Sequence, residues 1–385
     1  GNLALGAVDD LELTERVAAA IAGDLARAGI GLDLAPVADA NTNPRNPIVG
    51  VRAFGSDPEL VARHVAAFVR GMQACRVAAC AKHFPGHGDT SADSHLELPR
   101  VEGDLEAALV PFRAAVVAGV RAVMTGHLLV PALDDVPATI SSRIVHDLLR
   151  GELGFTGLVV TDALEMRAIS AGVGVEEGAV RALAAGVDAL CLGHDLGDEA
   201  VDAVRRAIVE AVREGRLTEE RLAEAAARVE ATARWATGGE TGGRDAAVGA
   251  EAARRALRVE GDTTIEAAPL VVELAPQPTI AAGPAGFSFA EAARRAWPGA
   301  ETVRLGAGDP EPELDGRPLV LVLRDAGRHE WQQRLAAKLL AAGAGAIVVE
   351  TGLPGTRPAG AAGYVTTFGA SRASLLAAVE ALQTA

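Results

Sequence analysis

The 385-residue sequence predicts an α/β protein with a parallel β-sheet in its first part and a smaller α/β domain in its second. Three observations support this prediction. Short apolar runs alternate with amphipathic helical stretches over the first 235 residues, polar residues follow the apolar runs, and a glycine-rich stretch separates two different patterns. A chain of this length is also comfortable for two domains.

The strands predicted in the first part are short, apolar and largely β-branched, as expected for strands buried on both faces. They lie at 31–37, 77–83, 121–127, 157–161 and 187–193. Helical patterns lie near 11–28, 57–74, 105–118, 142–152, 176–185, 198–214 and 218–235. Five parallel strands are fewer than the eight that close a barrel of the common size. The sheet is therefore either open or part of a barrel that lacks about three strand–helix units.

The glycine-rich stretch at 237–245, TGGETGGRD, is predicted to be a linker. The following residues, 246–385, start a new pattern of apolar runs and helices. Strands are expected at 269–274, 301–305, 318–323, 345–349 and 363–367, and helices at 289–296, 329–342 and 371–383. This pattern predicts a smaller α/β sandwich domain of flavodoxin-like outline.

Charge and composition exclude several classes of partner. The net charge is −15, with 51 acidic and 36 basic residues, which repels nucleic acids and anionic membrane surfaces. No apolar run approaches the ~20 residues that a membrane helix needs. The three cysteines show no disulfide framework, so a reducing, cytoplasmic setting is expected.

The densest group of reactive residues is the run KHFPGHGDTSADSH, which follows the second predicted strand. Its polar members are Lys82, His83, His87, Asp89, Asp93 and His95. The residue types alone are compatible with four interpretations of the loop. These are a metal site, a binding site for sugar or phosphate, an acid/base loop in which Asp93 orients His95, and a polar structural loop.

Asp162 is the second notable residue, in the run GLVVTDALEM. It is the first charged residue after an apolar strand, which places it at the carboxyl edge of the sheet. Asp39 and His127 follow other predicted strands and are expected at the same edge. One interpretation is a helix N-cap, a common use of Asp. The other is a carboxylate nucleophile that attacks an anomeric carbon.

Three segments together resemble the β-N-acetylglucosaminidase branch of glycoside hydrolase family 3. KHFPGHGDTSADSH resembles its pattern K-H-[FI]-P-G-x-G followed by D-S-H. LAPVADANTNPRNPIVGVRAFGSDP and GELGFTGLVVTDALEM resemble its preceding segment and its nucleophile segment, in the same order. The resemblance covers about 1–235 and implies that residues 1–236 form a (β/α)8 TIM-type barrel lacking its first three strand–helix units.

The resemblance also implies roles for individual residues. Asp162 would be the nucleophile of a retaining double displacement, and His95 the general acid/base with Asp93 as its partner. The residues implied to bind substrate are Arg52, Lys82, His83, His127 and Met124. Asp39 is expected to support the floor of the site. Neither a metal nor a cofactor is implied, although phosphate is a possible co-substrate because a neutral imidazole does not repel an anion.

The implied function is that of a retaining exo-β-N-acetylglucosaminidase. It would release terminal N-acetylglucosamine from peptidoglycan- or chitin-derived saccharides. Three alternatives stay open: a phosphorylase of the same glycosides, a metal-dependent hydrolase, and a truncated, catalytically impaired paralogue that only binds sugar. The third is favoured by one departure from the family pattern, since the early D-x-E-G-G segment is absent and the chain is expected to begin inside the barrel.

Overall fold

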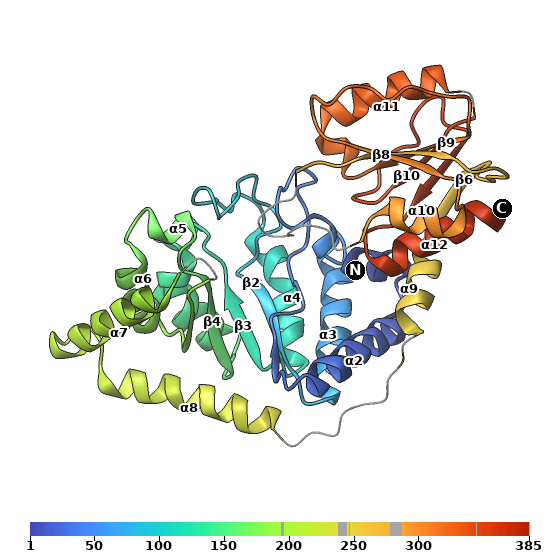
Figure 1. Ribbon diagram of the computed structural model, residues 1–385. Helices are drawn as coiled ribbons and strands as arrows, with labels where there is room; N and C mark the ends of the chain where they lie inside the picture. Colours follow the sequence, from blue (N-terminus) through green and yellow to red (C-terminus); the bar gives the residue numbers. More distant parts are fainter. Residues whose placement is uncertain (194–195, 238–244, 246, 278–286, 344, 385) are drawn as a thin grey trace. The chain divides into compact units, whose positions relative to one another are not determined.

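The computed structural model describes residues 1–193, 196–237, 245, 247–277, 287–343 and 345–384. The chain packs as two compact units (Figure 1). The barrel unit comprises 9–49 and 53–246, and the sandwich unit comprises 1–8, 50–52 and 247–385. The first eight residues and the short 50–52 segment therefore depart from the predicted boundaries. Most of the predicted linker, 238–244, lies outside the described residues.

The sheet of the barrel unit contains five parallel strands, paired strictly in chain order. They are β1 (Leu32–Asp33), β2 (Ala78–Phe84), β3 (Ala122–Thr125), β4 (Leu158–Ala163) and β5 (Ala189–Cys191). A doubly wound sheet reverses its strand order, whereas a barrel keeps it. The order therefore identifies the sheet as part of a TIM-type barrel, and its five strands are three fewer than a closed barrel has.

The helices of the barrel unit follow the predicted ranges closely, except for the short α5, which was not predicted. They are α2 (Leu11–Arg27), α3 (Pro58–Ala74), α4 (Leu105–Val117), α5 (Arg167–Ser170), α6 (Val175–Ala185), α7 (Asp198–Arg213) and α8 (Glu219–Ala236). The side chains of Asp10, Asp57, Asp104 and Thr218 accept backbone N–H groups at the first turns of four helices, which explains where these helices begin. The helix predicted near 142–152 is instead the π-helix η3 (Arg143–Glu152), whose apolar residues stay buried.

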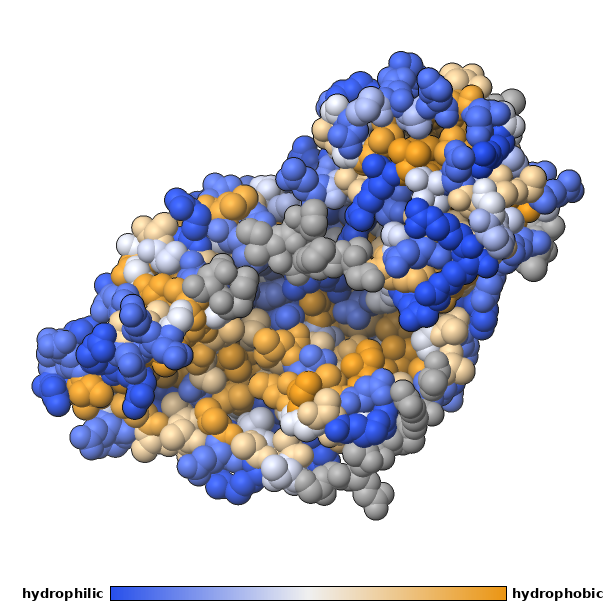
Figure 2. Space-filling model, viewed as in Figure 1, coloured by the Kyte–Doolittle hydropathy of each residue, from blue (hydrophilic) through white to orange (hydrophobic). Residues whose placement is uncertain are grey.

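The inner face of the barrel sheet is apolar. Cys80, Ala122, Met124, Leu158 and Val160 form one buried cluster on it. A cavity of about 600 Å³ lies between α8 and the N-terminal ends of the strands. Figure 2 shows apolar residues along this hollow. In a closed barrel, side chains from all eight strands fill the interior. The hollow is thus the part of the interior that five strands leave unfilled.

A buried carboxylate fastens α8 and η3 to the strand starts. Asp188 is 6% exposed and accepts hydrogen bonds from Arg150 (2.6 Å), Arg221 (2.5 Å) and Arg228 (3.0 Å). The backbone N–H of Val159 donates a further bond of 3.0 Å. One carboxylate therefore joins η3, β4 and α8, and its loss leaves three guanidinium groups facing one another.

We expect Asp188→Asn to lower the free energy of unfolding of the barrel unit by about 3–5 kcal/mol, the usual cost of breaking a buried ion pair. Urea denaturation followed by circular dichroism measures the change. Glu230→Gln is the matched control, because Glu230 pairs with Arg234 on the exposed face of the same helix, where a pair is worth ~0.2–1 kcal/mol. A loss below ~1 kcal/mol for Asp188→Asn would contradict the anchoring role.

The sandwich unit contains a six-stranded sheet in the order β6-β11-β10-β9-β7-β8. Its strands are β6 (Arg258–Gly261), β7 (Leu270–Leu274), β8 (Glu301–Leu305), β9 (Leu319–Leu323), β10 (Ile347–Glu350) and β11 (Gly363–Thr366). Strands β7 to β11 are parallel and their order corresponds to 2-1-3-4-5, as predicted for a flavodoxin-like outline. The antiparallel edge strand β6 was not predicted, because all four of its residues are exposed and it has no apolar run.

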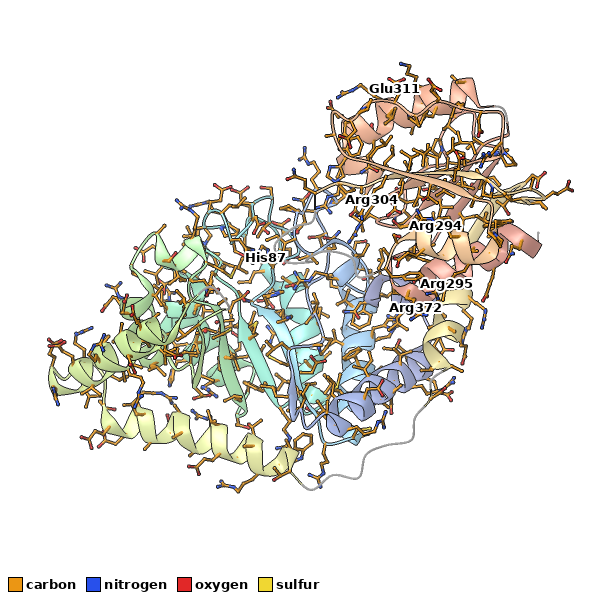
Figure 3. All side chains as sticks on the ribbon, viewed as in Figure 1. His87, Arg294, Arg295, Arg304, Glu311 and Arg372 are labelled. Atoms are coloured by element: carbon orange, nitrogen blue, oxygen red, sulfur yellow. The ribbon has the colours of Figure 1, made fainter. Side chains whose placement is uncertain are left out.

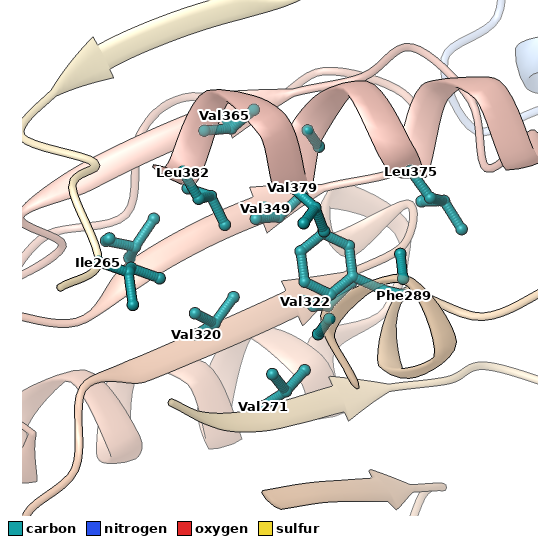
Figure 4. Packing of buried hydrophobic residues seen from close by; sticks show 14 of the residues in the cluster. Ile265, Val271, Phe289, Val320, Val322, Val349, Val365, Leu375, Val379 and Leu382 are labelled. Carbon is teal, nitrogen blue, oxygen red and sulfur yellow. The ribbon is translucent and has the colours of Figure 1, made fainter. Parts of the chain in front are cut away.

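Helices cover both faces of this sheet, because alternate residues of each strand point to opposite sides. On one face α10 (Phe289–Ala296) and α12 (Arg372–Thr384) bury Val271, Val320, Val322 and Val365 (Figure 4). On the other face α11 (Glu330–Ala342) packs against a second cluster of Leu and Val residues. Helices α1 (Asn2–Val8) and α9 (Val248–Ala256) also pack together, and Arg258 donates to the Ala7 carbonyl at 2.7 Å.

A carboxyl group lies almost fully buried at the end of β10. Glu350 is 2% exposed and accepts backbone N–H groups from Asp325 (2.9 Å), Ala326 (3.2 Å) and Gly352 (2.7 Å). Burial raises the pKa of Glu350 to about 7, and the nearby Asp325 carboxylate adds to the increase against the opposing effect of the three N–H groups. The folded protein therefore holds this proton more tightly than the unfolded chain does.

The raised pKa predicts that the sandwich unit loses stability as pH rises from about 4.5 to about 7. Below this window both states are protonated, and above it the folded state must hold a buried carboxylate. The full change is on the order of 3 kcal/mol at 1.36 kcal/mol per pKa unit. Urea denaturation at several pH values measures it. Glu350→Gln should remove the decline, whereas the exposed control Glu266→Gln should keep it; an unchanged slope in Glu350→Gln contradicts the assignment.

Candidate active site

The reactive residues of the barrel unit lie at one edge of its sheet. Asp39 follows β1, Lys82 and His83 lie near the end of β2, His127 follows β3, and Asp162 is the penultimate residue of β4. Because the strands are parallel, these ends meet at the same edge. His194 and Asp195, which follow the fifth predicted strand, lie outside the described residues.

Two of these strands are irregular at the reactive residues themselves. The β2–β3 register shifts between Lys82 and Phe84, and the β4–β5 register shifts between Val160 and Ala163. A bulge of this kind bends a strand and re-aims a side chain. The irregularities therefore decide how His83 and Asp162 are presented at the edge of the sheet.

A fully buried carboxylate organises the floor of the site. Asp39 is 0% exposed, and its Oδ2 lies 2.8 Å from Nδ1 of His83. Its Oδ1 accepts the backbone N–H groups of His83 (3.2 Å) and His87 (2.7 Å). Burial raises the pKa of Asp39, but the two histidines and these hydrogen bonds outweigh burial and hold it below its usual value. Asp39 is thus an ionised anchor for both residues, in agreement with its predicted place in the floor.

The orientation imposed by Asp39 directs His83 towards Asp162. With Nδ1 of His83 bound to Asp39, its Nε2 lies 4.0 Å from Oδ2 of Asp162. The side chain of Asp162 is 22% exposed, so its carboxylate still reaches the edge of the site. Burial raises the pKa of Asp162, but His83, His127, the N–H of Ala163 and Lys82 together bring it below the usual value. Asp162 is therefore ionised and partly accessible.

The helix N-cap interpretation of Asp162 is wrong. Asp162 lies within β4, and its Oδ1 accepts the N–H of the next residue, Ala163, at 2.9 Å. The following helix, α5, begins four residues beyond Ala163 and has Met166 at its N-cap. The carboxylate therefore does not cap a helix and is available for chemistry.

The structure gives His127 and Met124 supporting positions. His127 is 0% exposed, and its ring nitrogens contact Thr139 Oγ1 (2.8 Å) and the Ala163 carbonyl (2.9 Å). Burial holds the pKa of His127 below its usual value, so the ring is neutral and fixes the backbone beside Asp162. Met124 is 2% exposed, belongs to the apolar cluster of the sheet and pairs in register with Lys82 on the neighbouring strand. Both residues are predicted to line the sugar pocket, and the structure shows both side chains almost fully buried.

The Asp93–His95 pair forms as predicted. Nδ1 of His95 lies 2.7 Å from Oδ1 of Asp93, and the same oxygen accepts the backbone N–H of His95 at 2.8 Å. The two side chains are 21% and 14% exposed, so the outer ring nitrogen can reach a ligand.

His87 is a site residue to which sequence reasoning assigned no role of its own. It is 2% exposed, its Nδ1 lies 2.6 Å from Thr90 Oγ1, and its carbonyl accepts the Asn46 amide at 2.7 Å. Burial lowers the pKa of His87 to about 4, so the ring is neutral. Figure 3 labels His87 within the barrel unit. The presence of His87 beside His83 in the same motif was the only sequence signal for a role. The fold was needed to show that the His87 side chain is buried. His87 holds the start of the loop that carries Asp93 and His95.

The remaining predicted binding residues fall in different units. Lys82 pairs in register with Met124 on β3, and its charge lowers the pKa of Asp162. Arg52 belongs to η1 (Gly50–Arg52) of the sandwich unit, where its carbonyl accepts the Asn2 amide at 2.8 Å. The structure thus brings Lys82, His83 and Asp162 to one edge of the barrel sheet, whereas Arg52 belongs to the other unit.

Over the described residues, no group of three or more His, Cys, Asp or Glu side chains is arranged to hold a metal ion. Within the same ranges, no helix combines the length and apolarity needed to cross a bilayer. In the 82–95 loop, the three histidines hydrogen-bond with Asp39, Thr90 and Asp93.

Known proteins resemble this chain in sequence and in structure. A beta-hexosaminidase of Stenotrophomonas maltophilia (strain K279a) is 42% identical over 200 residues, covering 51% of this chain and 59% of that protein. A beta-N-acetylglucosaminidase/beta-glucosidase of Cellulomonas fimi is 36% identical over 243 residues, covering 59% and 42%. The chain therefore spans only about half the length of these curated relatives.

A solved structure matches nearly the whole chain. It is a glycoside hydrolase family 3 beta-N-acetylglucosaminidase from Paenibacillus sp. str. FPU-7, with a TM-score of 0.84, 32% identity, and coverage of 99% of this chain and 79% of that one. The family description "Glycosyl hydrolase family 3 N terminal domain" matches residues 1–232. With that match extending over more than half of its residues, the chain belongs to glycosyl hydrolase family 3.

Proposed function

We propose that this chain is a retaining exo-β-N-acetylglucosaminidase acting on peptidoglycan- or chitin-derived saccharides. The observation that carries the proposal is the pairing of an ionised, partly accessible carboxylate, Asp162, with a hydrogen-bonded Asp93–His95 pair on the neighbouring loop. The names of the relatives support the choice of N-acetylglucosamine as the sugar. A reducing, cytoplasmic setting is supported by the three free cysteines, Cys75, Cys80 and Cys191.

In the first step, the Asp162 carboxylate attacks the anomeric carbon and forms a glycosyl ester. The bond from that carbon to the leaving oxygen breaks, and His95 donates its proton to this oxygen. Asp93 accepts the Nδ1–H of His95 and stabilises the charged ring before the transfer. In this arrangement Asp39 fixes the ring of His83, and Nε2 of that ring lies 4.0 Å from Oδ2 of Asp162.

In the second step, His95 removes a proton from water, and the hydroxide attacks the same carbon. The ester bond to Asp162 breaks, which restores the carboxylate and releases the sugar with its original configuration. Neither step needs a metal or a cofactor. Lys82 is the proposed hydrogen-bond donor to the sugar hydroxyls.

A phosphorylase is the second candidate function, because the proposed acid/base is an imidazole. A carboxylate in that place would repel phosphate, whereas a neutral imidazole does not. Phosphate would then replace water in the second step and leave as the sugar 1-phosphate. Release of sugar 1-phosphate when phosphate is added distinguishes this reaction from hydrolysis.

Asp162→Asn should reduce hydrolysis of a chromogenic β-N-acetylglucosaminide by at least ~10³-fold, because the amide cannot form the ester. Turnover by the 385-residue chain is measured with and without phosphate. Asp147→Asn, an exposed substitution on η3, should retain activity. Equal turnover in the Asp162 variant would refute its role. A folded parent chain that binds the sugar and turns nothing over would favour the sugar-binding paralogue.

Asp93→Asn should lower turnover by ~10²–10⁴-fold, about as much as His95→Ala, because the two side chains act as one unit in proton transfer. The double variant should lose little more than either single variant. Glu97→Gln is the control, since it removes an exposed carboxylate from the same loop. Near wild-type kcat in Asp93→Asn, or additive losses in the double variant, would exclude a coupled pair.

A further inference from the structure

The sandwich unit has a second edge where strand ends meet. Its strand order reverses between β7 and β9, since β8 pairs with β7 on one side and the later strands follow β9 on the other. In open parallel sheets, ligands bind outside the carboxyl ends of the strands at such a reversal. The chemistry assigned to the barrel unit uses none of the residues at this position.

Three charged residues lie at this position on the same face of the sheet. Glu273 of β7 pairs in register with Arg304 of β8 on one side and with Val322 of β9 on the other. Arg324 follows Val322 by two residues, which places it on the same face. All three line a cavity of about 30 Å³, about twice the ~10–15 Å³ that one water needs. The cavity can therefore take a small polyatomic group but not a sugar ring.

The side chains of Arg304 and Arg324 make no polar contact that stabilises the described part of the fold. Over the described residues, neither Arg304 nor Arg324 forms a side-chain hydrogen bond or an ion pair, although both lie within electrostatic range of Glu273. Unpaired guanidinium groups at a cavity are typical of oxyanion recognition.

Glu273 complements these arginines. Its Oε2 is buried without a hydrogen-bond partner among the described residues. Burial raises the pKa of Glu273, against the opposing fields of Arg304 and Arg324. The raised pKa makes it easier for this carboxyl to take up a proton and donate it to an anion between the arginines, which would satisfy a group that is otherwise costly to bury.

Two further arginines extend the positive charge at the rim. Phe287 lines the same cavity, and the guanidinium carbons of Arg295 and Arg372 lie 5.5 and 5.4 Å from its ring centroid. Figure 3 shows these two residues and Arg304 around the same end of the unit. Such a concentration of arginines contrasts with the net charge of −15 of the whole chain.

We propose that this cavity binds the phosphate group of a small ligand, with Arg304 and Arg324 as donors and Glu273 as a third contact. The proposal does not depend on the proposed glycosidase activity. The ligand is either inorganic phosphate or a phosphate monoester, and both present the same group to the cavity.

Isothermal titration of the 385-residue chain with inorganic phosphate, at constant ionic strength set with chloride, tests the proposal. We expect saturable binding with one phosphate per chain. Arg304→Gln and Arg324→Gln should each raise Kd by at least ~10-fold, as expected for losing a charged hydrogen-bond donor. Arg334→Gln, an exposed substitution on α11 that pairs only with Glu330, should leave Kd unchanged.

Circular dichroism of the variants confirms that each is folded before its Kd is compared. Absence of binding to the folded parent chain overturns the proposal. Binding that survives both arginine substitutions also overturns it, because the phosphate then occupies another place, such as the barrel site. Repeating the titration with glycerol phosphate identifies the source of the group: tighter binding indicates a monoester, and weaker binding indicates free phosphate.

Discussion

The active-site edge depends on the buried carboxylate of Asp39. It joins the end of β1 to both histidines of the following loop, through three hydrogen bonds to its two oxygens. A carboxylate with no exposure to water is costly unless it is fully hydrogen-bonded, so this arrangement tolerates little change. His83 is thereby oriented towards Asp162, and the loop that carries Asp93 and His95 begins from a fixed point.

Close packing reinforces this constraint. A Cβ on Gly88 would lie 1.6 Å from the Ala40 carbonyl oxygen, so only glycine allows the loop to approach the segment after β1. Beyond Gly88, Asp89 accepts the backbone N–H groups of Glu102 and Gly103, which ties the loop to the start of α4. The Asp93–His95 pair is thus presented on a loop that is held at several points, as a preorganised site requires.

The other end of the barrel sheet is held by different means. There the interior is a hollow, and α8 crosses the strand starts through Asp188 and through Trp235, whose ring lies beneath the guanidinium groups of Arg76 and Arg121. An ion network and two cation–π contacts therefore contribute to stability where side chains from further strands would otherwise pack. The half-barrel separates these two tasks, with chemistry at the strand ends and attachment of α8 at the strand starts.

Most strands and several residues of the candidate site could be predicted from the sequence. The sequence pattern located ten of the eleven strands that the structure describes, because a buried strand needs continuous hydrophobicity. The motif around Lys82–His95 predicted the Asp93–His95 pair, and the run around Asp162 predicted a carboxylate at a strand end; both are local features. Only the tertiary structure decided the rest. Strand order showed part of a barrel, the register shifted next to His83 and Asp162, His127 and Met124 became buried, and strand register brought Glu273 beside Arg304. These features depend on contacts between residues far apart in the chain, and hydrophobic periodicity carries no information about which distant residues meet.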